Sequence, residues 1–402
     1  HFQRLEWLPV MINESAVIDS IKLYEINIPL KIPFQISGGT SYSRKSLIIV
    51  LCSEGVCGYG EAAPNEEPYY SSETISSVKA LYNDLLFKRI INKKIDSIED
   101  INNILCEGIR GNNFARAGIE NAYWDLICRK NNTTLRKLIE YKLEQLGVEG
   151  EDLRSKGYVE SGVSIGIPMD KDLETLGKWA GEYIGSGYRR VKIKIKPGWD
   201  VKAVEAVRKV IGNDFPLWTD SNASFDFELH KDIFKKMDQY GCLFHEQPLN
   251  YDDLIDHAKL SRYINTPVCL DESLKSLRTA KQAIEIGASR IWNIKIQRIG
   301  GLYEGLLIYK LASENDVSLW GGTMPESGLG AIFILNLASF SRFKYPADVE
   351  ASERWYGPGN DIVEIKMDKD GYISVPDCRG VESIINFSNL SRFGKLLRYI
   401  KR

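Results

Sequence analysis

The first third of the chain changes from the two-residue alternation of strands to the longer period of helices. Apolar and polar residues alternate over 17–29, and an apolar run at 47–52 is followed by Gly55 and Gly58. Apolar residues then recur at helical spacing over 72–87 and 114–129. The charged stretch 135–155 shows no clear period and is interpreted as a connector. This part of the chain therefore predicts strands followed by helices.

From about residue 158 the pattern becomes regular. Eight short apolar runs lie at 159–167, 191–195, 217–220, 243–246, 268–271, 291–296, 317–320 and 343–348. Helix-like stretches separate them, such as 200–211, 227–240, 251–264, 274–286 and 302–314. Eight strands alternating with seven helices are typical of a (β/α) barrel. A Rossmann fold is disfavoured because no G-x-G-x-x-G motif follows the first strand.

The tail after residue 351 predicts a strand at 361–366, a second strand at 371–375 and a helix at 387–399. We expect it to pack back on the N-terminal segment. Residues 1–17, which begin at His1, are interpreted as a tag remnant or disordered leader.

Composition and charge exclude several classes of partner. The chain has 402 residues, 44% of them hydrophobic, and its 52 basic and 54 acidic residues give a net charge of −2. Such a balance gives no electrostatic footprint for nucleic acid. No apolar run approaches the roughly 20 residues that span a bilayer. Seven cysteines, an odd number, are interpreted as buried thiols in a reducing compartment. A soluble cytoplasmic protein with no nucleic-acid or membrane partner is therefore expected.

Five charged residues recur near the ends of successive predicted barrel strands: Lys194, Asp220, Glu246, Asp271 and Lys295. They lie 24 to 26 residues apart, about the length of one βα unit. Each step therefore returns the chain to the same end of the barrel, one strand further round. The C-terminal end of such a barrel builds the active site.

The three carboxylates would repel one another unless a cation lay among them. Each could singly be a solvated strand-end residue, but three in phase favour a metal site. Oxygen ligands without His or Cys indicate Mg²⁺ or Mn²⁺ rather than zinc.

The lysines are expected on opposite sides of the barrel mouth. Lys194 lies on the second strand and Lys295 on the sixth, and Lys192 shares a face with Lys194. A solvated edge strand is the alternative for 192–196, but a barrel strand has no solvated face. Two amines beside a cation suit removal of a proton next to a carboxylate. The cation and the second ammonium are expected to lower the pKa of the base.

These residues lie in segments that match a known family. The segments are 191–200 (VKIKIKPGWD), 219–223 (TDSNA), 246–249 (EQPL), 270–273 (LDES), 293–295 (NIK) and 320–328 (WGGTMPESG). The chain resembles the enolase superfamily, in its muconate-lactonising branch, and within it the o-succinylbenzoate synthases and N-acylamino acid racemases. Segments 68–73, 115–122 and 371–376 are similar to the capping domain of that family.

The resemblance implies a fold: a (β/α)7β TIM-like barrel at 151–349 and an α+β capping domain built from 18–150 and 350–402. It also implies a small-molecule carboxylate substrate and a homo-oligomer. Two departures concern specificity: Pro325 stands where Leu is usual, and Asn65 replaces an apolar residue in the capping loop. The end of the site that holds the acyl group is therefore left open.

The resemblance also implies roles for ten residues. Lys194 and Lys295 would be the acid/base pair; Asp220, Glu246 and Asp271 the metal ligands; and Lys192, Ser164, Asn222, Arg298 and Glu326 the substrate contacts, Lys192 by neutralising the substrate carboxylate. For Arg298, a salt bridge that holds the loop after the sixth strand is an equal alternative. His245 alternates to the opposite face from Glu246 and is interpreted as a packed histidine.

The expected function is a Mg²⁺-dependent dehydration to o-succinylbenzoate through α-proton abstraction and an enediolate, with N-succinylamino acid racemisation as a second activity. Dipeptide epimerase is the main alternative, because Asp348 and Glu350 could hold an α-ammonium, although a solvated strand exit explains them equally well. A muconate cycloisomerase-like enzyme is a further alternative. A non-catalytic scaffold is disfavoured because it has no reason to keep five charged residues at one rim.

Overall fold

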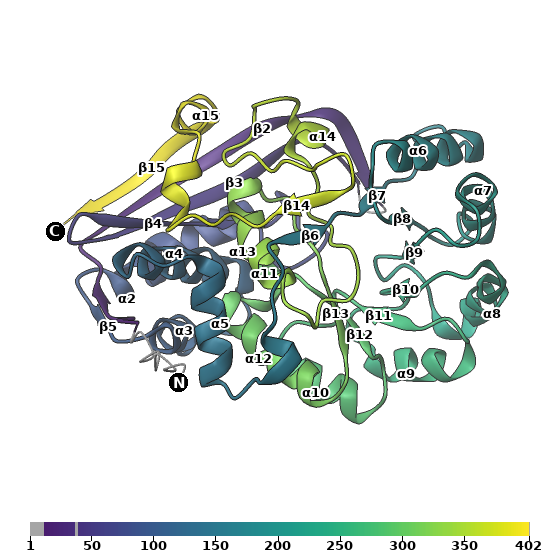
Figure 1. Ribbon diagram of the computed structural model, residues 1–402, viewed down its shortest axis with the longest axis horizontal. Coiled ribbons are helices and arrows are strands. Elements are labelled where there is room, and N and C mark those ends of the chain that lie inside the picture. Colours follow the sequence, from purple (N-terminus) through teal and green to yellow (C-terminus); the bar gives the residue numbers. More distant parts are fainter. Residues whose placement is uncertain (1–11, 37–38, 402) are drawn as a thin grey trace, which may run out of the picture.

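A four-stranded antiparallel sheet forms the base of the N-terminal domain in the computed structural model, which describes residues 12–36 and 39–401. Its order is β15-β2-β3-β4, with β2 at Ser20–Ile36, β3 at Gly39–Ser53, β4 at Val56–Ala62 and β15 at Gly394–Lys401. The expected helix at 387–399 is therefore wrong beyond α15 (Phe387–Phe393). The chain turns at Gly394 and pairs with the outer edge of β2, whose free backbone groups would otherwise lack partners (Figure 1).

Helices lie on one side of this sheet. They are α1 (Ile75–Leu81), α2 (Phe87–Ile90), α3 (Ile98–Cys106), α4 (Asn113–Lys130) and α5 (Leu135–Gln145). Of these, α1 and α4 lie directly against the sheet, and α3 and α5 pack on α4. Close contact of α4 with β4 depends on two glycines. A Cβ on Gly58 would lie 2.2 Å from the carbonyl oxygen of Ala122, and one on Gly60 would lie 2.3 Å from that of Gly118.

Two expectations for this domain are corrected. The segment 135–155, interpreted as a connector, contains α5, which begins after Thr134 as N-cap and buries Leu135, Leu138 and Leu143. The predicted leader also extends too far. Glu14 is buried and pairs with Lys142 at 2.9 Å, and β1 (Ala16–Val17) pairs with β5 (Lys94–Ile95). Residues 1–11 of the predicted leader lie outside the described residues.

The barrel sheet has seven parallel strands in the order β13-β12-β11-β10-β9-β8-β7. In chain order they are β7 (Val163–Ile165), β8 (Val191–Lys194), β9 (Leu217–Asp220), β10 (His245–Glu246), β11 (Val268–Leu270), β12 (Ile291–Ile294) and β13 (Ser318–Gly321). Their helices are α6 (Leu173–Gly185), α7 (Val201–Ile211), α8 (Phe227–Met237), α9 (Leu254–Tyr263), α10 (Leu277–Glu285), α11 (Ile296–Ile299), α12 (Leu302–Glu314) and α13 (Gly328–Ala338). The predicted alternation is confirmed for these seven strands.

The eighth predicted run, 343–348, is not a regular strand. Single parallel bridges join Phe343 to Leu319 and Ala347 to Ser161, so the segment touches both edges of the open sheet without forming a ladder. In the tail, β14 (Tyr372–Ser374) pairs with β6 (Tyr158–Glu160), and α14 spans Ser352–Tyr356. The strand predicted at 361–366 does not form; Asp361 instead accepts the backbone N–H of Gly328 at the start of α13.

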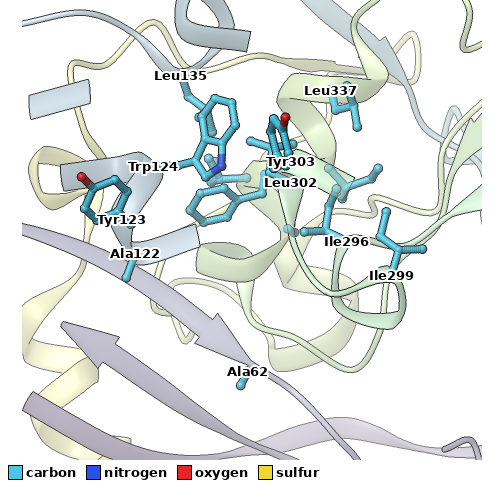
Figure 2. Packing of buried hydrophobic residues seen from close by; sticks show 14 of the residues in the cluster. Ala62, Ala122, Tyr123, Trp124, Leu135, Ile296, Ile299, Leu302, Tyr303 and Leu337 are labelled. Atoms are coloured by element: carbon cyan, nitrogen blue, oxygen red, sulfur yellow. The ribbon is translucent and has the colours of Figure 1, made fainter. Parts of the chain in front are cut away.

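A continuous hydrophobic core joins the N-terminal domain to the barrel. Trp124 of α4 packs in one cluster with Ile296 and Ile299 of α11 and Leu302 of α12 (Figure 2). Two buried carboxylates reinforce this contact at helix N-termini. Glu120 accepts the N–H groups of Leu302 and Tyr303 of α12. Glu61 accepts those of Ser327, the N-cap of α13, and of Gly330 in its first turn. The capping domain is thereby anchored over the barrel, and the exact domain bounds stay a prediction.

The expectation that all seven cysteines are thiols is wrong for one pair. Cys52 and Cys57 face each other across the β3–β4 hairpin with their Cα atoms 4.0 Å apart, and they form a disulfide. The other five are free, and Cys128, Cys242 and Cys269 are buried. None of the helices in the described ranges is long and apolar enough to cross a membrane.

Candidate active site

Three acids meet at the C-terminal ends of adjacent strands. Asp220 ends β9, Glu246 ends β10, and Asp271 follows β11. Parallel pairing sets Glu246 beside Asp220 and beside Cys269, two residues before Asp271. One oxygen of each carboxylate lies within 4.8 Å of the others, and all three side chains are buried. The structure thus brings together the three acids that the residue spacing placed side by side.

The two lysines flank these acids. β8, which carries Lys194, and β12, after which Lys295 follows, stand on either side of the three acidic strands. Lys194 Nζ donates to Asp220 Oδ2 at 2.5 Å, and Lys295 Nζ donates to Asp271 Oδ2 at 2.7 Å. Lys192 lies 3.3 Å from Asp220 and 3.4 Å from Glu246, on the same side as Lys194.

Burial and charge oppose each other in this cluster. Burial and the neighbouring Asp220 raise the pKa of Glu246 to about 8. Burial also acts to raise the pKa of Asp220, but the ammonium groups of Lys194 and Lys192 outweigh it and hold that pKa below its usual range. For Lys295, burial lowers the pKa, yet Asp271 outweighs it and raises the pKa well above the usual value. At Lys295, the lowered pKa expected for the base is therefore not produced by these protein groups alone.

The residues present fit a hard divalent cation. The donor set consists of oxygen atoms only, which suits Mg²⁺ or Mn²⁺. The Oε2 atom of Glu246 is buried without a hydrogen-bond partner, so an acceptor is left over for a ligand. The other oxygen of Glu246 is held in place by the side-chain amide of Asn293 at 2.8 Å.

A cavity of about 150 Å³ opens above this cluster. Five predicted site residues line it: Ser164, Lys192, Lys194, Asn222 and Lys295. The N-terminal domain contributes Leu30, Phe34, Ser41, Arg44, Asn65 and Tyr70. The later part of the chain contributes Thr323, Met324, Pro325, Asp348 and Glu350 from loops and Trp355 from α14. Both lysines thus face one compartment that is covered by the capping domain.

Arg298 and Glu326 are not among the described residues that line this cavity. Arg298 is buried, forms an ion pair with Asp271, and donates to the carbonyl oxygens of Leu274 (2.8 Å) and Asn293. This geometry matches the salt-bridge alternative for Arg298. Glu326 lines a separate cavity of about 20 Å³, where burial and Glu61 raise its pKa well above the usual range. Direct substrate contact by either residue stays a prediction.

Asp348 and Glu350 are neither solvated nor free. Asp348 pairs with Lys192 at 2.5 Å and Arg190 at 2.7 Å. Glu350 pairs with Arg354 and accepts the backbone N–H of Ser164. Because protein cations already neutralise both carboxylates, neither offers an open acceptor for a substrate ammonium. The solvated strand exit considered from the sequence is wrong, since the side chain of Glu350 is buried and that of Asp348 is only 9% exposed.

His245 is packed on the far side of its strand, as expected. It is fully buried, its Nδ1 lies 2.7 Å from the hydroxyl oxygen of Thr219, and burial lowers its pKa to about 4.

Tyr70 is a site residue that sequence reasoning missed. Its hydroxyl donates to Asp271 at 2.9 Å and accepts from Lys295 at 3.4 Å. Only its place in the capping loop could have indicated it.

Backbone strain is concentrated beside the acids. Asn222 (φ 43°) and Ala223 (φ 61°), two and three residues after Asp220, and Gln247 (φ 37°), directly after Glu246, adopt the left-handed region. Non-glycine residues there cost roughly 1–3 kcal/mol each and gather at functional sites. The strained turn lets Asn222 accept from Lys194 Nζ at 2.8 Å while its N–H donates to Asp220 Oδ1 at 3.0 Å.

Comparisons with known proteins agree with this geometry. The mandelate racemase / muconate lactonizing enzyme N-terminal domain model matches residues 19–140, and the enolase C-terminal domain-like model matches residues 175–381. An o-succinylbenzoate synthase of Geobacillus stearothermophilus is 35% identical over 96% of this chain and 98% of that protein. An N-succinylamino acid racemase of Thermus thermophilus is 34% identical over 95% of this chain and 99% of that protein. A crystal structure of an enolase superfamily member from Listeria innocua superposes with a TM-score of 0.86 at 32% identity, covering 96% of this chain and 99% of the other.

Proposed function

This chain belongs to the mandelate racemase and muconate lactonizing enzyme family of the enolase superfamily, and from that premise we propose that it is a Mg²⁺-dependent o-succinylbenzoate synthase that also racemises N-succinylamino acids. The observation that carries the proposal is the pair of lysines, Lys194 and Lys295, on either side of three buried carboxylates in one cavity. Relatives that align over nearly the whole chain are named for one or the other of these two activities.

The two lysines supply proton transfer at a carbon next to a substrate carboxylate. In racemisation, one lysine amine takes the α-proton from one face, and the ammonium of the other returns a proton to the opposite face. In dehydration, one lysine amine takes the α-proton and the electrons of the C–H bond pass to the substrate carboxylate. These electrons then form the C=C bond to the neighbouring carbon as its hydroxyl leaves as water, with a proton from a lysine ammonium. Both reactions begin with the same step, so one site can perform both.

Asp220, Glu246 and Asp271 would hold the Mg²⁺. When bound, the cation supplies positive charge that stabilises negative charge on the substrate carboxylate. Lys192 lines the same cavity, and its ammonium can neutralise a second part of that charge. The Tyr70 hydroxyl is hydrogen-bonded to both Asp271 and Lys295. It therefore fixes these two side chains relative to each other from the side of the capping domain.

The dipeptide epimerase alternative loses its support in the structure. It rested on Asp348 and Glu350 as acceptors for a substrate ammonium, and both carboxylates are paired with Lys192, Arg190 and Arg354 instead. The homo-oligomer implied by the family resemblance stays a prediction.

Two assays on the purified protein test the proposal. With Mg²⁺ present, we expect formation of o-succinylbenzoate from its cyclohexadiene precursor, followed by absorbance, and loss of optical rotation of an N-succinylamino acid. Addition of EDTA should abolish both, and excess Mg²⁺ should restore both. A protein that converts neither substrate with Mg²⁺ would exclude this function.

A further inference from the structure

One cation in the cavity wall has no acidic partner. Lys192, Lys194 and Lys295 each pair with a buried carboxylate of the barrel. Arg44, which enters the same cavity from β3 of the capping domain, forms no ion pair with any carboxylate in the described part of the chain. A charged group that lines a partly enclosed cavity without a counter-ion is poised to bind an anion.

The guanidinium of Arg44 is held in a fixed position. It stacks over the ring of Trp355 at 4.0 Å, and it donates to the backbone carbonyl of Glu326 at 3.3 Å. The side chain of Glu326 forms no ion pair with this guanidinium in the described part of the chain, and burial together with Glu61 disfavours its charged form by raising the pKa of that carboxyl well above its usual range. Arg44 is therefore preorganised while its charge stays available.

Two further polar groups line the same cavity from the same domain. Ser41 lies three residues before Arg44 on β3, and Asn65 follows β4. Within the described ranges, neither the Ser41 hydroxyl nor the Asn65 side-chain amide has a hydrogen-bond partner. Asn65 is also the residue that replaces an apolar one in the capping loop. Guanidinium, hydroxyl and amide groups together are donors suited to a carboxylate.

We propose that Arg44, with Ser41 and Asn65, binds the distal carboxylate of the succinyl group, at the opposite end of the substrate from the carboxylate held beside the lysines. The proposal rests on the proposed function and specifies its substrate class. The cavity then takes dicarboxylates, and the succinyl chain is the feature that the lyase substrate and the racemase substrates share. Leu30, Phe34 and Met324 supply apolar wall around the part between the two carboxylates.

Binding calorimetry tests the subsite without relying on turnover. The probes are N-succinylglycine and N-acetylglycine. The first has a –CH₂–COO⁻ group where the second has a hydrogen, and neither has a stereocentre; the one additional methylene accounts for only about 0.8 kcal/mol, less than a 10-fold difference in affinity. In the presence of Mg²⁺, we expect the wild-type protein to bind N-succinylglycine at least 10-fold more tightly. Equal affinity for the two compounds would overturn the proposal, whether or not the protein proves to be a racemase.

Kinetics with one amino acid acylated in two ways locate the effect at Arg44. Arg44→Met keeps the apolar stem against Trp355 and should lower kcat/KM for the N-succinyl substrate by about 10- to 100-fold, the value of a charge-assisted hydrogen bond. Turnover of the N-acetyl substrate should change less than about 3-fold. Arg44→Lys should recover part of the loss.

The matched control is Lys45→Met on the next residue of β3, which pairs with Glu66 and is not among the residues that line the cavity above the acids. This control variant should change kcat/KM for neither substrate by more than about 3-fold. An equal loss on both substrates in Arg44→Met, or no loss on either, would show that Arg44 does not recognise the distal carboxylate. Inactivity of the wild-type protein on both substrates would instead contradict the proposed function, and calorimetry would still decide the subsite.

Discussion

Asp348→Asn is the substitution that separates an internal charge-neutralising role from a substrate-binding role for the acid at the end of the eighth barrel segment. The asparagine has the same shape but no charge. It leaves Arg190, which is fully buried, and Lys192, which is 3% exposed, without their shortest ion pairs. Removing one partner of a buried ion pair costs about 3–5 kcal/mol.

The remaining contacts place the expected cost near the lower end of that range. Arg190 keeps its hydrogen bonds to the carbonyl oxygens of Val163 (3.0 Å) and Pro346 (3.1 Å). Lys192 keeps Asp220 and Glu246 at 3.3 and 3.4 Å. We therefore expect a loss of about 3 kcal/mol in the free energy of unfolding at neutral pH.

Urea denaturation followed by tryptophan fluorescence, in EDTA, measures this loss. Asp316→Asn is the control, because its side chain is fully exposed beside Arg342 and its removal should cost less than about 1 kcal/mol. Although burial acts to raise the pKa of Asp348, Lys192 and Arg190 hold it below its usual range. The stabilisation is thus present above about pH 4 and disappears as the pH falls further. An Asp348→Asn protein within 1 kcal/mol of wild type at pH 7 would refute the reasoning.

Two other changes test the anchoring of the capping domain and the metal site. Gly58→Ala places a Cβ against the backbone of α4 and should lower the free energy of unfolding, measured by urea denaturation, by about 1–3 kcal/mol. The control Gly157→Ala, whose Cβ would meet no atom within 4 Å, should change it by no more than about 0.5 kcal/mol. Equal stability of the two variants would contradict the close packing. Glu246→Gln keeps the side-chain shape and should weaken Mg²⁺ binding at least 10-fold in calorimetry. The control Glu364→Gln, on a half-exposed side chain outside the site, should leave Mg²⁺ binding unchanged. Unaltered Mg²⁺ binding in Glu246→Gln would show that Glu246 is not a metal ligand.

The sequence could predict the barrel and its charged rim because both follow from a repeat. Apolar runs mark buried parallel strands, and a spacing of 24 to 26 residues places Asp220, Glu246 and Asp271 at one end of the sheet. The polar alternation of Lys192 and Lys194 likewise placed both lysines on the inner face. These are local patterns whose spatial meaning is fixed by the fold class.

Features that depend on contacts distant in sequence could not be predicted. Residues 394–399 belong to the predicted helix 387–399, yet pairing with the free edge of β2 makes them part of strand β15. The segment 343–348 is apolar enough for a strand, but it contributes only single bridges. Arg44 and Trp355 lie more than 300 residues apart and meet only in the folded chain. No spacing rule relates residues of the capping domain to those at the barrel mouth. The residues that determine substrate specificity could therefore not be predicted from the sequence.

Exchange of the α-proton of an N-succinylamino acid with D₂O, followed by NMR separately for each enantiomer, is the most direct measurement of proton transfer by two opposed lysines. With Mg²⁺, the wild-type protein should exchange both enantiomers and racemise them. Lys194→Ala and Lys295→Ala should each abolish racemisation while retaining exchange of one enantiomer, a different one for each variant. Racemisation at the wild-type rate in either variant, or exchange of the same enantiomer by both, would show that these lysines do not act from opposite faces of the carbon.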